Sequence, residues 1–193
     1  MPSLTHYELF DLAKRLGIDL HTFRTFVETG TYLGDTTQDM LPFFTSLHTI
    51  ELSEKFYQLA LTRFASEKSV QCHQGDSTDI LPLLCPLLDS NTVFWLDGHF
   101  SAGPTAQGAK DCPLVEELQA ISQHLSSDAL IIIDDARLFG WKGDQDWSAI
   151  TEESLLAVLD PQRIVQSFYI PSALHPRDRF VIYYTSASTA NAE

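Results

Sequence analysis

The sequence predicts an α/β fold built on one mostly parallel sheet, and two observations carry that prediction. Short runs rich in β-branched and aromatic residues alternate with longer segments of helical spacing, and 193 residues suit one domain with a sizeable core. Strands that alternate with helices form right-handed crossovers and therefore pair in parallel. The expected strands are Phe23–Glu28, Leu47–Leu52, Val70–Gln74, Thr92–Asp97, Ala129–Asp134, Arg163–Ile170 and Arg179–Thr185.

Helices are indicated between the strands by apolar residues that recur at helical spacing. One is expected over residues 53–64 behind an N-cap at Ser53, one over residues 113–125 with Pro113 in its first turn, and one near residues 151–159. The expected buried faces are Phe56, Leu59, Ala60 and Phe64 in the first helix and Leu114, Leu118, Ile121 and Leu125 in the second. The apolar run Leu130–Ile133 suits a central strand covered on both faces.

The end of the chain breaks this alternation. Only residues 171–178 separate the last two expected strands, which is too short for a helical crossover, so the last strand should enter the sheet antiparallel. We expect one domain over residues 1–185, beginning with a helical segment over residues 1–22, and a disordered tail over residues 186–193. The amphipathic stretch Leu4–Leu16 suits either a lid or a contact between two copies of the chain.

The composition narrows the class of partner. Twenty-six acidic residues against twelve Lys and Arg give a formal net charge of −14, which argues against nucleic acid and against an anionic membrane surface. Small molecules, or proteins with a basic face, are the expected partners. The N-terminus lacks the apolar region of a signal peptide, so a cytoplasmic protein is expected. Three cysteines without metal-type spacing fit a reducing compartment, and Cys72 is expected to be buried.

The residues that follow each expected strand are the candidates for function, because ligands of open α/β sheets bind at the carboxyl ends of the strands. After the first strand, Glu28 precedes a turn with Gly30 and Gly34, where the chain can bend tightly and approach a ligand. This is not the GxGxxG pattern of a dinucleotide site, and the acidic residue suits a cofactor with a cationic amine. Glu51 ends the second strand, placed either for ribose hydroxyls or to begin the next helix, and Asp76 follows the third as an adenine acceptor or a helix cap.

The ordered motifs ETGTYLGDTT, IELS, GDS and WLDGH, over residues 28–99, resemble those of the class I S-adenosylmethionine-dependent methyltransferases. The resemblance extends over roughly residues 24–185. It implies the Rossmann-like class I methyltransferase fold, a mostly parallel seven-stranded sheet with an antiparallel last strand and helices on both faces. The first turn departs from the family pattern, with Thr31 and Tyr32 where a second glycine often stands. The cofactor-binding residues implied are Glu28, Thr29, Gly30, Thr31, Gly34, Glu51, Leu52, Asp76, Ser77 and Asp97.

Acidic residues also follow the fourth and fifth strands. Asp97, Asp134 and Asp135 should converge at one mouth, where unpaired carboxylates repel one another and a hard divalent cation such as Mg²⁺ would relieve the repulsion. The arrangement resembles the metal-dependent O-methyltransferases, more closely the macrocin and mycinamicin sugar type and the related cephalosporin-hydroxylase-like proteins than the catechol type. That resemblance implies these three residues as metal ligands. The alternative is that Asp97 only orients the cofactor and the acidic pair caps a loop.

His99 is the candidate general base, because a neutral imidazole can take a proton from a substrate hydroxyl near pH 7; its alternative is a structural histidine. Residues 100–111 suit either an active-site loop or an ordinary connection. Arg137 suits a substrate anion or an ion pair with the neighbouring aspartates, and the aromatic stretch Phe139–Trp147 suits a pocket wall or core packing.

The sequence therefore favours an S-adenosylmethionine-dependent methyltransferase that methylates a hydroxyl of a small molecule with the help of a divalent metal ion. Two other classes stay open. One is a non-catalytic S-adenosylmethionine-binding protein, and the other is a metal-dependent hydrolase or hydroxylase-like enzyme on the same fold.

Overall fold

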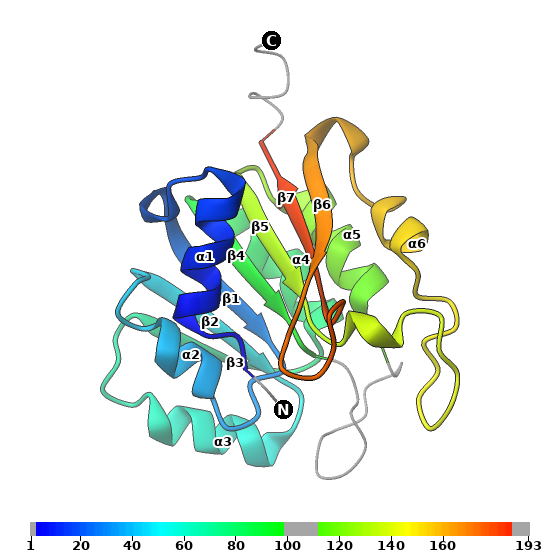
Figure 1. Ribbon diagram of the computed structural model, residues 1–193. Helices are drawn as coiled ribbons and strands as arrows, with labels where there is room; N and C mark the ends of the chain where they lie inside the picture. Colours follow the sequence, from blue (N-terminus) through cyan, green and yellow to red (C-terminus); the bar gives the residue numbers. More distant parts are fainter. Residues whose placement is uncertain (1–2, 99–111, 187–193) are drawn as a thin grey trace.

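The structure, a computed structural model, describes residues 3–98 and 112–186. Within them, seven strands form one sheet in the order β3-β2-β1-β4-β5-β7-β6 (Figure 1). Neighbouring strands pair in parallel except where β7 is a partner, so β7 runs antiparallel to the rest, as predicted. The strands are β1 (Phe23–Thr29), β2 (Ser46–Glu51), β3 (Val70–Gln74), β4 (Asn91–Leu96), β5 (Ala129–Ile133), β6 (Ile164–Ile170) and β7 (Arg179–Tyr184).

Helices cover both faces of this sheet. Figure 1 shows α1, α2 and α3 in front of it and α4 and α5 behind it. The α-helices are α1 (His6–Leu16), α2 (Asp35–Met40), α3 (Glu54–Arg63), α4 (Ser77–Leu84), α5 (Leu114–His124) and α6 (Glu152–Leu156). Single turns of 3₁₀ helix are η1 (Leu20–Thr22), η2 (Cys85–Leu87), η3 (Ala136–Leu138) and η4 (Pro161–Arg163).

The first helix, α1, has clear start and stop signals. Thr5 and Glu8 form a capping box, in which the Thr5 hydroxyl accepts from the Glu8 N–H and the Glu8 carboxylate accepts from the Thr5 N–H. Gly17 ends the helix in the left-handed conformation, with φ +68°. The buried side chains of Leu9 and Leu12 pack on the sheet, so α1 is part of the core of the domain.

Two apolar layers enclose the sheet, and alternating strand residues supply both. On the α1 and α2 side, Phe26, Leu47, Val93, Leu130 and Val181 pack in one buried cluster with the helices. On the α4, α5 and α6 side, Val27, Ile50, Phe94, Ile131 and Ile182 do the same. The residues of β5 are buried throughout, which confirms the central strand that the sequence predicts.

Two local predictions need correction. Leu59 of α3 is 46% exposed, because α3 covers the edge of the sheet, where fewer strands lie beneath it. Cys72 is half-buried on the edge strand β3. Ser53 is the N-cap of α3, as predicted, although its side chain makes no cap hydrogen bond; its main-chain N–H donates to the Glu51 carboxylate.

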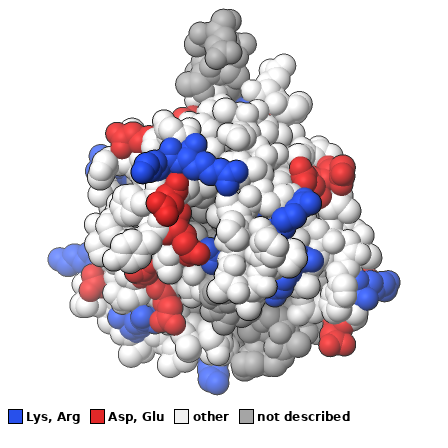
Figure 2. Space-filling view, viewed as in Figure 1, with Lys and Arg blue, Asp and Glu red and all other residues white. Residues whose placement is uncertain are grey.

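Acidic and basic side chains are interspersed over the described part of the face shown in Figure 2. None of the helices in the described residues is long and apolar enough to cross a membrane.

Candidate functional site

The turn after β1 is shaped by Gly30. Its φ of +83° lies in the left-handed region, and its N–H donates to the Ile50 carbonyl at 2.9 Å. A Cβ atom on this residue would lie 2.3 Å from the carbonyl oxygen of Asp97 and 3.0 Å from the Cα of Gly98. Only glycine therefore lets the chain after β1 pack directly on the chain after β4.

The same turn continues through two more left-handed residues. Tyr32 has φ +48°, which is uncommon for a residue with a side chain. Its ring packs against Phe56 of α3, with the ring centroids 4.7 Å apart. Gly34, at φ +79°, is the N-cap of α2, and a Cβ there would lie 2.9 Å from the Phe64 ring. Both glycines that the sequence singled out are thus required by close packing as well as by backbone conformation.

Glu51, at the end of β2, is fixed by this turn. One oxygen of its buried carboxylate accepts from the Tyr32 N–H at 2.8 Å, and the other accepts from the Ser53 N–H at 2.8 Å. Each carboxylate oxygen has a further lone pair for a ligand hydroxyl. The predicted ribose contact of Glu51 and the predicted contribution of Leu52 to cofactor binding stay predictions.

Glu28 lies beneath the turn. It is 2% exposed, and its carboxylate accepts from the Thr37 hydroxyl at 2.6 Å and from the Thr49 hydroxyl at 3.0 Å. Burial raises the pKa of Glu28 to about 7, although the hydrogen bonds from these threonines act in the opposite direction. Thr31 shares a hydrogen bond with Thr49. Glu28 therefore supports the turn through threonine hydroxyls, and its predicted contact with the cofactor stays a prediction.

Asp76 and Ser77 follow β3, next to Glu51. The Gly75 N–H donates to the Glu51 carbonyl at 3.0 Å, which ties the third turn to the second. Asp76 is the N-cap of α4, and its carboxylate accepts from the Thr78 N–H at 3.0 Å and the Thr78 hydroxyl at 2.8 Å. The helix-cap alternative for Asp76 is therefore present, and its second carboxylate oxygen is left for a ligand.

The chain after β4 joins the chain after β1. The Asp97 N–H donates to the Thr29 carbonyl at 3.1 Å, and Asp97 is half-buried. The Thr29 hydroxyl is buried and has no hydrogen-bond partner within the described residues. It lies 3.0 Å from the position of a Cβ on Gly98, just beyond the carboxyl ends of β1 and β4. The predicted base His99 and the loop of residues 100–111 lie outside the described residues.

One buried carboxylate near this point was missed by the sequence analysis. Glu117 of α5 is fully buried, and its Oε1 lies 3.3 Å from the position of a Cβ on Gly98. The sequence held a signal for it, because Glu117 falls between Leu114 and Leu118 on the apolar face of its helix. A charged residue at such a position indicates a paired or functional group.

A second group of carboxylates lies where β5 ends and β7 begins. Oxygens of Asp134, Asp135 and Asp178 lie within 4.8 Å of one another, and all three side chains are buried. We call these three residues the acidic cluster. Among the described residues, Asp97 is not part of it. The sequence analysis missed Asp178, because its place beside Asp135 depends on β7 running antiparallel and so beginning at this edge.

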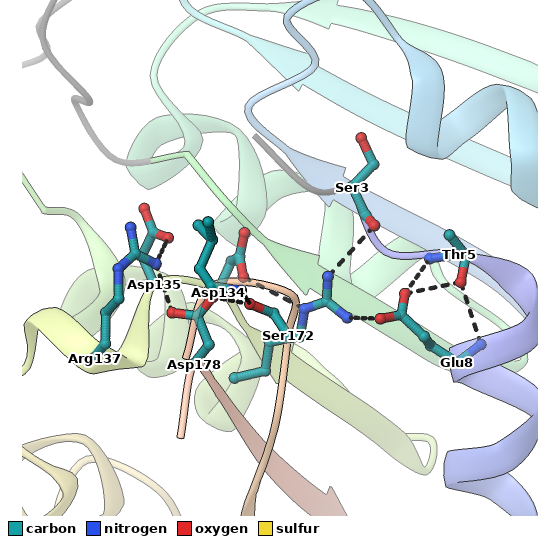
Figure 3. A network of polar contacts seen from close by, with 10 residues as sticks. Ser3, Thr5, Glu8, Asp134, Asp135, Arg137, Ser172 and Asp178 are labelled. Atoms are coloured by element: carbon teal, nitrogen blue, oxygen red, sulfur yellow. Dashed lines mark hydrogen bonds and ion pairs between the residues drawn. The ribbon is translucent and has the colours of Figure 1, made fainter. Parts of the chain in front are cut away.

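Two arginines contact the acidic cluster: Arg137, labelled in Figure 3, and Arg179. Arg137 donates to both Asp135 and Asp178, so the ion-pair alternative for this residue is the one observed. Arg179 donates to Asp134 at 3.4 Å and to Glu8 of α1 at 2.7 Å. Burial and the neighbouring Asp135 raise the pKa of Asp134 to about 6, against the influence of Arg179.

The aromatic residues of the stretch Phe139–Trp147 differ in their burial. Trp147 is fully buried in the core on the α5 side, whereas Trp141 is 44% exposed. Core packing is thus the role of Trp147.

Known proteins resemble this chain in structure, whereas comparisons of sequence find no match. No family model matches the sequence, and no curated protein matches it. A Staphylococcus aureus protein provisionally described as a caffeoyl-CoA O-methyltransferase superimposes with a TM-score of 0.63 at 12% identity, covering 96% of this chain and 86% of that one. The N-methyltransferase NodS of Bradyrhizobium japonicum gives 0.57 at 13% identity over 93% and 95%, and an Aquifex aeolicus SAM-dependent methyltransferase gives 0.55 at 14% over 92% and 89%.

The chain has the class I methyltransferase fold. The strand order of this fold places the ends of β3, β2, β1 and β4 side by side, so Asp76, Glu51, Gly30 and Asp97 lie along one edge of the sheet. The acidic cluster follows at β5 and β7 on the same edge. The glycine turn and the acidic cluster therefore lie along the same edge of the sheet.

Proposed function

We propose that the chain is an S-adenosylmethionine-dependent methyltransferase that acts on a hydroxyl group of a small molecule. The observation that carries the proposal is the turn after β1, where Gly30 packs against the Asp97 carbonyl and Tyr32 holds Glu51. That arrangement supports a cofactor with a ribose and a cationic amino-acid part, because it combines closely approaching main chain with a carboxylate.

The residues present fit the cofactor. Gly30 lets the main chain after β1 pack closely on the Asp97 carbonyl, Glu51 has lone pairs for hydroxyl donors, and the buried Thr29 hydroxyl lacks a partner among the described residues. Asp76, with one carboxylate oxygen bonded to Thr78, has the other for an amino donor. When bound, S-adenosylmethionine supplies an electrophilic methyl group, and the protein supplies binding and orientation.

A hydroxyl acceptor is supported by the carboxylates along this edge of the sheet. An ionised carboxylate accepts hydrogen bonds and donates none. Asp97 and Asp134 are therefore suited to orient a hydroxyl group that donates its hydrogen. A carboxyl group with a pKa near 6, as at Asp134, can also take up a proton close to neutral pH. The assignment of His99 as general base stays a prediction.

The sequence predicted that Asp97, Asp134 and Asp135 bind a divalent metal ion, and the positions of these residues bear on that prediction. The acidic cluster has the oxygen chemistry that Mg²⁺ prefers, but it contains Asp178 in place of Asp97. Its members already accept hydrogen bonds from Arg137 and Arg179. The residues therefore do not fit the predicted metal site, and no step of the proposed activity runs through a metal ion.

Calorimetric titration of S-adenosylhomocysteine into the full chain, with chelator and with Mg²⁺, tests the cofactor. The informative variant is Glu51→Gln, and its matched control is Glu54→Gln, which changes an exposed carboxylate of the same segment that bonds to Gln58 and Gln74. We expect saturable binding by the wild type and the control, and binding about tenfold or more weaker in Glu51→Gln, because a charged acceptor is lost.

The outcomes separate the alternatives. No binding in either buffer would overturn the proposal and leave the glycine turn to another ligand, such as a phosphate group. Binding without methyl transfer to any of a set of hydroxylated compounds would favour the non-catalytic binding protein. Hydrolysis of phosphate esters without cofactor binding would favour the hydrolase.

A further inference from the structure

The acidic cluster needs positive charge close by. Asp134, Asp135 and Asp178 are at most 4% exposed, and their oxygens lie within 4.8 Å of one another. Buried carboxylates this close raise one another's energy unless a cation lies among them. A metal ion is one way to meet that need, and a guanidinium group is another.

Arg137 supplies this positive charge for two members of the acidic cluster, Asp135 and Asp178. A single nitrogen, Nη1, donates to Oδ1 of both Asp135 and Asp178, so the positive group bridges the two carboxylates. The other Asp178 oxygen accepts from the Ser172 hydroxyl. The Asp178 carbonyl accepts from the Ala136 N–H at 2.7 Å, which fixes the loop before β7 against the loop after β5.

Arg179 supplies the positive charge for the third member, Asp134. The side chain is 1% exposed; its Nε donates to Asp134 and its Nη1 donates to Glu8, while Nη2 reaches the Ser3 carbonyl at 3.4 Å. The guanidinium lies 5.1 Å from the centre of the Trp95 ring, which favours a cation there as well. Because arginine does not lose its proton in proteins, this charge is permanent. Figure 3 shows the resulting connection from Glu8 of α1 to the acidic cluster.

From these contacts we infer that Arg137 and Arg179 are positioning residues that supply the counter-charge of the acidic cluster, in the place where the sequence predicted a divalent cation. Together with Glu8, which also pairs with Arg179, the three aspartates and the two guanidinium groups have a formal charge of −2. A divalent cation bound to the same oxygens would lie against two fixed positive charges and be repelled by both. The inference rests on the proposed function only in assigning the cluster to the acceptor side of the site.

The test measures metal binding without using activity. Mn²⁺ is titrated into the full chain near neutral pH, and the free ion is followed by its electron paramagnetic resonance signal. We expect no saturable binding at the cluster by the wild type up to about 1 mM, the weak end of protein sites for divalent cations. Saturable binding that Asp135→Asn removes would overturn the inference. Binding that Asp135→Asn leaves unchanged lies elsewhere and supports it.

Arg137→Gln tests the role of the arginine directly. Arg137 is partly exposed, so the variant should fold, and it leaves Asp135 and Asp178 without their bridging cation. We expect at least a tenfold gain in Mn²⁺ affinity. The matched control is Arg177→Gln, which removes an equal charge from the loop before β7, next to Asp178, but faces the Tyr169 ring.

A folded Arg137→Gln variant that gains no Mn²⁺ binding would overturn the assignment, since the arginine would not then be what keeps the ion out. Circular dichroism establishes folding in each sample. Binding of S-adenosylhomocysteine, measured with chelator in the same samples, keeps this result apart from the proposed function. Loss of that binding in the wild type would count against the proposed function alone.

Discussion

The carbonyl oxygen of Asp97 lies 2.3 Å from the position that a Cβ atom on Gly30 would take. The two loops that this contact joins follow β1 and β4, the neighbouring strands at the centre of the site. A side chain at residue 30 would force them apart. The contact therefore links the shape of the turn after β1 to the position of the Asp97 main chain.

Gly30→Ala should accordingly damage both stability and cofactor binding. The left-handed conformation alone costs about 1–2 kcal/mol for alanine, and the clash adds a further ~1–3 kcal/mol. The matched control is Gly17→Ala, since Gly17 has a similar φ of +68° but nothing within 4 Å of its Cβ position. We expect the control to lose about 1–2 kcal/mol of unfolding free energy and to keep its affinity for S-adenosylhomocysteine. Equal affinities in the two variants would refute the packing argument.

The buried carboxyl of Glu28 should make a contribution to stability that is lost as the pH rises from about 4.5 to 7. Its folded pKa of about 7 is above the usual 4.5, so the folded state keeps a proton that the unfolded state loses in this range. The stabilisation is complete below pH 4.5 and lost above about 7, and the gap corresponds to about 3 kcal/mol. Glu28→Gln cannot titrate and should lack this loss. Urea unfolding at pH 5 and pH 8 measures it, and parallel losses in both proteins would exclude Glu28 as the source.

His48 should give the opposite dependence over nearly the same pH range, so the two contributions are separated by comparing the Glu28 and His48 variants with the wild type. Burial, together with the neighbouring His73 at 3.1 Å, lowers the pKa of His48 from 6.5 to about 4. In this range the His48 ring binds a proton in the unfolded state but not in the folded state. Stability is therefore lost as the pH falls from about 6.5 to 4. His48→Asn keeps a polar group near the Nδ1 position and should flatten this part of the curve. His124→Asn, at an exposed histidine, should follow the wild type.

Much of this architecture could be predicted because its causes are local. The run Ala129–Ile133 is apolar at every position, and a strand buried on both faces needs nothing else. Gly30 was recognised by its place after a strand, and the structure adds the backbone contact that demands it. The antiparallel entry of β7 followed from the length of the preceding loop.

The features that could not be predicted depend on contacts between distant segments. Asp178 belongs with Asp134 and Asp135 only because β7 begins at the edge where β5 ends, so a residue more than forty positions away completes the group. Arg179 was assigned to a strand, with no sign that its side chain would join α1 to the cluster. The buried charge of Arg179 is explained by Glu8 and Asp134, which lie beside it only in the folded chain.

That connection through Arg179 yields a last prediction, which concerns stability. Arg179 and Asp134 are each 1% exposed, and removing one partner of a buried ion pair leaves an uncompensated charge, at a cost of about 3–5 kcal/mol. Arg179→Met keeps the aliphatic bulk and should lower the unfolding free energy by that amount near pH 8, where Asp134 is ionised. Adding Asp134→Asn removes the stranded charge and should restore part of the loss. Urea unfolding of the wild type, both single variants and the double variant gives the coupling free energy between the two side chains. Additive effects would mean that Arg179 acts mainly through Glu8.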